Sequence, residues 1–101
     1  MIDIDYIHEI RESVPAAALY EQLAEECVEL AQAALKMARH LRNENPTPMT
    51  EEHIKHNLIE EASDAHLVSR ILDIKPDLHI VTAKLARWYD RLIDAEREAR
   101  K

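Results

Sequence analysis

The sequence predicts an all-α protein of four helices, and three observations predict it. The 101 residues include no glycine and only four prolines, so few positions favour a turn or break a helix. Ala, Leu, Glu, Lys and Arg, which favour helices, dominate the long segments. Apolar residues recur at intervals of three and four rather than alternating. We therefore expect a single four-helix, bundle-like domain over residues 1–101, with a short first helix and three longer antiparallel helices.

A proline separates the first two helices. A short helix is expected over about residues 3–13, because Pro15 disfavours helical torsions at Val14 and suits the start of a new helix. The second helix then covers about residues 15–42, and its roughly 28 residues extend about 40 Å, longer than a compact domain of this size requires. Residues 43–49, with two asparagines and two prolines, are the expected loop.

A capping signal marks the start of the third helix, and a proline-containing connection separates it from the fourth. Thr50 is a good N-cap before the first-turn acids Glu51 and Glu52, so a third helix is expected from residue 50 to residue 72 or 73. A tight connection at residues 73–77 contains a proline and ends this helix. A fourth helix then runs to the C-terminus. Its apolar stripe consists of Leu78, Val81, Leu85, Trp88 and Leu92.

Charge and composition exclude several classes of function. The formal net charge is −7 and no basic face is evident, which argues against a protein that binds nucleic-acid polymers or membrane surfaces. The first five residues lack the order of a signal peptide, and no apolar run reaches the roughly 18 residues that span a bilayer. Cys27 is the only cysteine, so no disulfide forms within the chain. We expect a cytoplasmic protein.

An acidic motif occurs twice, 35 residues apart. It consists of two adjacent acids and a third acid three residues after the second, and its members are Glu25, Glu26, Glu29, Glu60, Glu61 and Asp64. Glu26 and Glu61 each interrupt the apolar stripe of their helix, at a position that the helical period assigns to the core. Two helices are therefore expected to turn acidic side chains inward.

Carboxylates that are withdrawn from water need a neutralising partner, because the effective desolvation penalty is several kcal/mol per ion. Neither acidic stripe contains a lysine or arginine. Mg²⁺ prefers oxygen ligands and is usually held by a few carboxylates together with substrate phosphates, so it is the expected cofactor, with Mn²⁺ as the alternative. The competing interpretation is that a chain with 20 acidic residues produces such pairs on solvated faces by chance. Two copies in phase with the core argue against it.

The chain resembles the MazG-like, all-α nucleoside triphosphate pyrophosphohydrolase superfamily in two segments, EQLAEECVELAQAALK at residues 21–36 and EEASDA at residues 60–65. The family pattern is ExxE on one helix and ExxD on the next, and the resemblance covers about residues 16–95. It implies the MazG-like fold and Mg²⁺-dependent hydrolysis of a nucleoside triphosphate to a monophosphate and pyrophosphate. It also implies a role in house-cleaning of the nucleotide pool and a homodimer or homotetramer.

The resemblance implies a role for each acid. The implied metal ligands are Glu26, Glu29, Glu61 and Asp64. Glu25 and Glu60 match the acids that precede them and are the candidate catalytic residues. Glu25 is a candidate for orienting the attacking water, and either glutamate is alternatively an outer-shell ligand.

Basic and amide side chains are candidates for binding the substrate. Lys36 lies two turns after the first motif on the same face and matches a lysine that is common in the family. Arg39, Lys84 and Arg87 are further candidates for the triphosphate, although a helical repeat of basic residues is also typical of a solvated face. Gln22 resembles a position from which relatives contact the nucleobase.

Two other hypotheses stay open. The first is a non-catalytic helical module that binds metal or assembles with itself, but such a scaffold has no reason to keep both Glu26 and Glu61 among core leucines. The second is a dUTP-specific enzyme of related fold, which shares the motifs and differs only in base recognition.

Overall fold

The computed structural model describes residues 1–44 and 48–101. Its four helices are α1 (Ile4–Ser13), α2 (Ala16–Leu41), α3 (Glu51–Ile71) and α4 (Leu78–Ala99), and the described residues contain no strand. The predicted all-α class, with a short first helix and three longer ones, is confirmed. Residues 45–47 of the predicted loop lie outside the described residues. None of the four helices combines the length and the hydropathy needed to cross a membrane.

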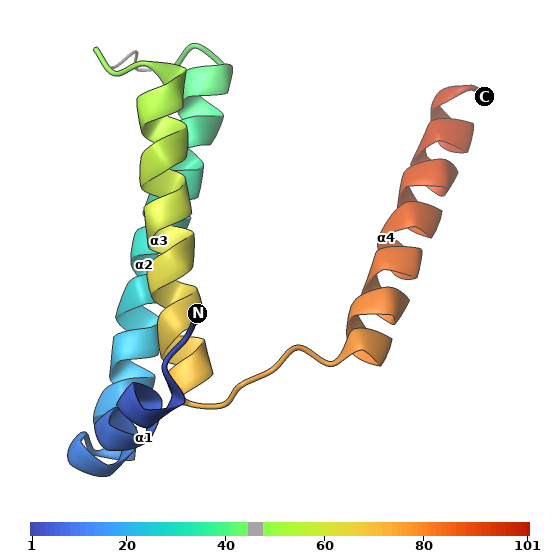
Figure 1. Ribbon diagram of the computed structural model, residues 1–101. Coiled ribbons are helices and arrows are strands. Elements are labelled where there is room, and N and C mark those ends of the chain that lie inside the picture. Colours follow the sequence, from blue (N-terminus) through green and yellow to red (C-terminus); the bar gives the residue numbers. More distant parts are fainter. Residues whose placement is uncertain (45–47) are drawn as a thin grey trace.

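The two central helices, α2 and α3, form an antiparallel hairpin that is the main body of the molecule (Figure 1). Their apolar stripes face each other. The buried residues of α2 and α3 are Leu19, Ile54, Ala65, Val68 and Ile71. Ile54 is the most deeply buried, with 1 % of its surface exposed, because it belongs to the apolar stripe of α3 that faces α2.

Helix α1 packs across one end of the hairpin (Figure 1). A small apolar cluster forms there from Ile7, Leu19, Ile71, Val14 and Leu72. The guanidinium of Arg11 donates hydrogen bonds to the backbone carbonyls of Ile71 and Arg70, the second at 3.3 Å from Nη2. These carbonyls belong to the last turn of α3, whose oxygens have no partner within the helix, so Arg11 caps α3 and fixes α1 against it.

The helix ends show how a chain without glycine makes its turns. Asn43 and Asp73 follow α2 and α3 with φ values of 57° and 58°, the left-handed region that asparagine and aspartate tolerate best after glycine. In both cases the N–H of the next residue donates to the carbonyl five positions earlier, at 2.8 and 2.9 Å. At the other ends, Thr50 caps α3 as the sequence predicts, and Asp77, which was not predicted as a cap, does the same for α4: each side chain accepts from a backbone N–H in the first turn.

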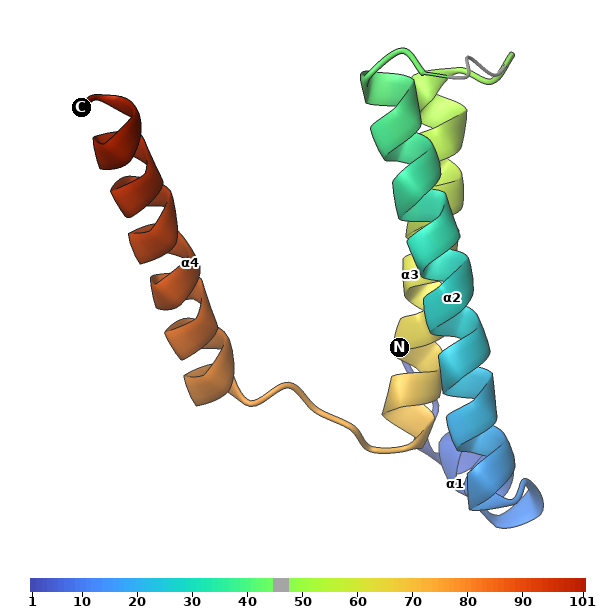
Figure 2. The ribbon, with the colours of Figure 1, turned by 180° about the vertical axis from the view of Figure 1, so that it is seen from behind.

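Helix α4 stands apart from the hairpin (Figures 1 and 2). It has no buried residue, and Leu85 and Trp88 of its apolar stripe are 65 % and 73 % exposed. The radius of gyration is 18.4 Å, against about 13 Å for a compact domain of this length. The predicted antiparallel packing therefore holds for α2 and α3 but not for α4 within one chain.

The connection before α4 explains the separation. Asp73 is fixed in the left-handed region, and Lys75 precedes Pro76, which favours extended torsions for the lysine. Asp77 is extended as well, as an N-cap must be. The chain therefore leaves α3 in an extended path and begins α4 at a distance from it.

Candidate metal centre

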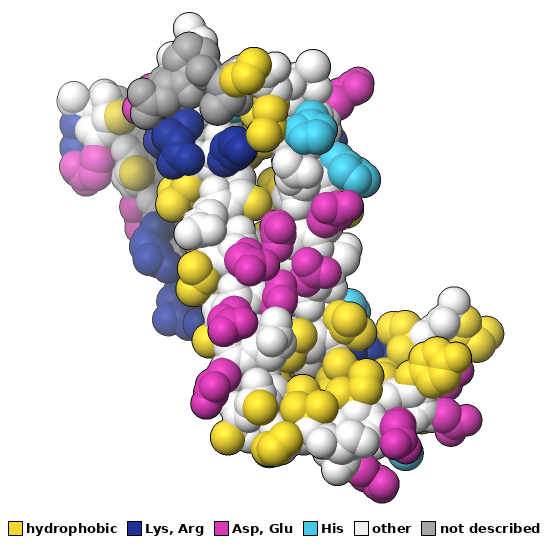
Figure 3. Space-filling view, turned by 90° about the vertical axis from the view of Figure 1, so that its left-hand side faces the viewer, with side chains coloured by type: hydrophobic (Ala, Val, Ile, Leu, Met, Phe, Trp, Pro, Cys, Tyr) yellow, Lys and Arg dark blue, Asp and Glu magenta, His cyan; other side chains and the backbone are white. Residues whose placement is uncertain are grey.

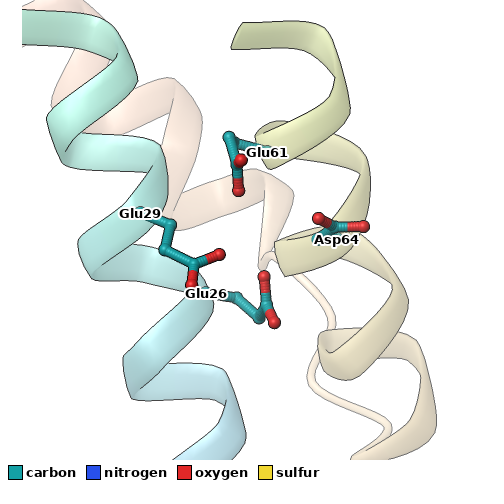
Figure 4. A group of neighbouring side chains, drawn as sticks. All are labelled: Glu26, Glu29, Glu61 and Asp64. Carbon is teal, nitrogen blue, oxygen red and sulfur yellow. The ribbon is translucent and has the colours of Figure 1, made fainter. Parts of the chain in front are cut away.

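Four acidic side chains from the two helices of the hairpin meet midway along it (Figure 4). Glu26 and Glu29 come from α2, and Glu61 and Asp64 come from α3. One carboxylate oxygen of each lies within 4.8 Å of those of the others. Residues three apart are neighbours on one helix face, and the antiparallel pairing of α2 and α3 places the two faces together. The structure thus brings together all four predicted metal ligands, which we call the acidic cluster.

The members of the acidic cluster differ in their exposure. Glu26 and Glu61 are half-buried, and the Oε2 atom of each is buried without a hydrogen-bond partner among the described residues. Glu29 and Asp64 are exposed at the edge of the cluster. The sequence predicted that all four acids point inward, but in the structure only Glu26 and Glu61 do so. A buried oxygen without a partner costs about 1–3 kcal/mol, so the inner pair is the feature of the hairpin that most needs a ligand.

The charges of the acidic cluster are not compensated within the described part of the chain. No lysine or arginine there forms an ion pair with any of the four carboxylates. Gln22 donates from Nε2 to Glu26 Oε1 at 2.7 Å, which satisfies one oxygen without adding charge. Two ionised carboxylates at the 4.8 Å limit of the cluster repel by about 3 kcal/mol at an effective dielectric constant of 20. A divalent cation with oxygen ligands removes this repulsion.

A pocket of about 520 Å³, open to solvent, adjoins the acidic cluster. It is lined by Glu29, Gln32, Ala33, Lys36, Arg39, Asn57 and Glu61. Lys36 and Arg39, which were predicted to bind the triphosphate, therefore share one pocket with two predicted metal ligands. Figure 3 shows this face of the molecule, with acidic side chains gathered midway along the hairpin and basic side chains above them.

Two polar residues of the pocket were not predicted as part of the site. Gln32 follows Glu29 by three positions and Asn57 precedes Glu61 by four, so both lie on the helix faces that contain the acids. This spacing was the available signal. Their amides offer both donors and acceptors to a ligand in the pocket.

Other predicted site residues lie outside the acidic cluster. Glu25 and Glu60 are exposed and do not belong to it, and Glu60 Oε1 lies 3.3 Å from His56 Nε2. Lys84 and Arg87 are on α4, and the single chain does not bring them to the pocket (Figure 1). Gln22 contacts the acidic cluster, as its hydrogen bond to Glu26 shows, and its predicted contact with a nucleobase stays a prediction.

No family model, curated protein or solved structure matches this chain. The site is therefore defined by its geometry, and the resemblance of the two motifs to a known superfamily stays a prediction.

Proposed function

We propose that the protein is a Mg²⁺-dependent nucleoside triphosphate pyrophosphohydrolase of the MazG-like, all-α superfamily. The observation that supports this is the proximity of the acidic cluster to Lys36 and Arg39 in one pocket. Clustered carboxylates alone suit a cation, and two basic side chains alone suit an anion. Both together suit a polyphosphate that arrives with its metal.

The roles of the residues follow from their chemistry. Mg²⁺ held by the acidic cluster would offset the negative charge that develops on the phosphate oxygens and activate a bound water. Lys36 and Arg39 bind the phosphate chain on the other side of the pocket. Glu25 or Glu60 orients the water that attacks the α-phosphorus. The bond from that phosphorus to the bridging oxygen breaks, and a monophosphate and pyrophosphate leave.

The test is product analysis of the purified protein with a panel of NTPs and dNTPs in the presence of Mg²⁺. The critical variant is Glu61→Gln, which keeps the shape of the side chain and removes its charge. Its matched control is Glu52→Gln, the same change on α3 at an exposed position two and a half turns away, on the opposite side of the helix. We expect equimolar monophosphate and pyrophosphate from the wild type and the control, and a loss of about 100-fold or more in Glu61→Gln.

Two outcomes would change this assignment. Turnover of dUTP alone would support the dUTP-specific hypothesis. No turnover of any nucleotide by the folded protein, with Mg²⁺ or Mn²⁺, would contradict the enzyme. Binding of Mn²⁺ in calorimetry, without turnover, would then support a metal-binding interaction module. The exposed apolar face of α4 is the observation that favours this second candidate.

A further inference from the structure

Helix α4 exposes large apolar side chains along its first four turns. We call this face the α4 stripe, and it consists of Leu78, Val81, Leu85, Trp88 and Leu92. These side chains are between 48 % and 77 % exposed, and they recur at intervals of three and four. Single exposed apolar residues are common, but a continuous apolar face on a 22-residue helix marks a surface that packs against something.

Helix α2 has a second apolar face that α3 does not cover. We call it the rear stripe, and it consists of Ala24, Cys27, Val28, Ala31 and Leu35, all exposed. Val28 follows the buried Leu19 by nine residues, which is two and a half turns, so the two side chains point to opposite sides of α2. Val28 and Leu35 are 56 % and 59 % exposed. The rear stripe is small at three of its five positions, which lets a neighbouring helix approach closely.

The N-terminal half of the rear stripe is bordered by an acid, and one edge of the α4 stripe is bordered by bases. Glu21 lies two turns before Val28, along one edge of the rear stripe. Lys84 and Arg91 lie four residues before and three residues after Trp88, along one edge of the α4 stripe. None of the three charged residues has an ion-pair partner in residues 1–44 and 48–101.

The length of the connection between α3 and α4 bears on whether α4 contacts the rear stripe of its own chain or that of a second chain. Asp73 has left-handed torsions, Asp77 is extended, and Pro76 favours extended torsions at Lys75. Five extended residues reach about 17 Å, whereas packed helices lie about 8–10 Å apart. The connection is thus long enough to carry α4 past its own hairpin to a second chain.

We propose that two copies of this chain exchange their fourth helices, so that the α4 stripe of each copy packs on the rear stripe of the other. The arrangement is a two-fold interface in which each chain gives and receives one helix. Each chain contributes the five residues of its α4 stripe and the five of its rear stripe, and the two-fold axis makes each pair of stripes occur twice. This inference does not depend on the proposed activity, because the rear stripe and the acidic cluster occupy different faces of α2.

The first test uses Trp88, the only tryptophan of the chain. Light scattering gives the mass, while the emission maximum of Trp88 and its quenching by acrylamide report its burial. We expect the mass of two chains together with blue-shifted, quencher-protected emission at micromolar concentration. A monomer with accessible Trp88 would overturn the proposal, as would a monomer with protected Trp88, in which α4 folds back on its own chain. A dimer with accessible Trp88 would also overturn it, because another surface would then form the interface.

The second test shows whether the contact is made between chains. Leu85→Asp damages the α4 stripe, and Val28→Asp damages the rear stripe. Each variant alone is expected to weaken the dimer by roughly 30-fold or more. The matched control is Ala83→Asp, an equal change in charge at an exposed position two residues before Leu85 and outside the α4 stripe, and it is expected to stay dimeric.

Mixing the two damaged variants gives the decisive result. A dimer of one chain of each variant has two contacts between an α4 stripe and a rear stripe. One contact contains both substitutions. The other contains neither, since the intact α4 of the Val28→Asp chain meets the intact rear stripe of the Leu85→Asp chain. We expect dimers in the mixture at concentrations where neither variant dimerises alone. Circular dichroism confirms that each variant is helical before mixing. Helical variants that stay monomeric in the mixture would overturn the exchange of helices.

Discussion

The hairpin of α2 and α3 and the isolated α4 contrast in their surroundings more than in their sequences. Helices α3 and α4 have 21 and 22 residues, a side-chain N-cap each and an apolar stripe at helical spacing. Yet Ile54 of α3 is 1 % exposed, whereas Leu85 of α4 is 65 % exposed. An amphipathic pattern therefore specifies a face that needs a neighbour, and the connections between helices determine whether the same chain supplies it.

The largest effect, on both cation binding and stability, is expected at the acidic cluster, where acids take the place of apolar residues between α2 and α3. Replacing both inner acids, as Glu26→Leu with Glu61→Leu, removes repulsion and two buried oxygens without partners. We expect the metal-free protein to gain about 1–4 kcal/mol in free energy of unfolding and to lose divalent-cation binding. Thermal melting in EDTA and calorimetry with Mn²⁺ measure the two changes.

The control for the double variant is Glu52→Leu, on the exposed side of α3. It is expected to keep cation binding and to change the free energy of unfolding by less than about 0.5 kcal/mol. A lower melting temperature of the double variant in EDTA would show that the two acids stabilise the hairpin, contrary to the electrostatic argument.

An effect on stability alone, without a change in cation binding, is expected from one substitution placed in each region. Ile54→Ala opens a cavity in the hairpin and should cost about 2–5 kcal/mol. Ile80→Ala on α4, where the isoleucine is 54 % exposed and outside the α4 stripe, should change the free energy of unfolding by less than about 0.5 kcal/mol. Urea denaturation followed by circular dichroism compares them, and similar losses in both would mean that Ile80 is buried against another part of the protein.

The smallest effect is expected at the N-caps. Thr50 accepts from the His53 N–H at 3.1 Å, and Asp77 accepts from the His79 N–H at 2.8 Å. Each change to alanine should cost about 1 kcal/mol of local helix stability. In the Leu85→Asp background, which separates the chains, Thr50→Ala should lower the urea midpoint of the hairpin, while Asp77→Ala should only speed amide hydrogen exchange in α4. An equal fall in the midpoint for Asp77→Ala would show that α4 and the hairpin unfold together.

The sequence was sufficient for the helices because each boundary has a local cause. Pro15 precedes α2, Thr50 and Asp77 cap α3 and α4, and Asn43 and Asp73 end α2 and α3. These causes act within a few residues, so they can be recognised without knowledge of the tertiary structure.

The site was predictable in part, for the same physical reason. Two motifs in phase with two facing stripes must meet, which is why the acidic cluster was expected from spacing alone. The spacing of the acids in the sequence does not determine how deeply each side chain is buried. When Glu26 lies in the interface between α2 and α3, Glu29 lies at the edge of that interface. The position of Lys84 and Arg87 depends on where α4 packs, and no pattern within α4 contains that information.

The separation of α4 also sets an order for folding. Helices α1, α2 and α3 contact one another within a single chain, so their folding is unimolecular and, for helical topologies, takes microseconds to milliseconds. In the proposed exchange, burial of the α4 stripe is then a second-order step whose rate rises with chain concentration. A newly made chain passes through a stage with a finished hairpin and an uncovered α4, and the net charge of −7 slows the unspecific collisions that would end that stage in aggregation.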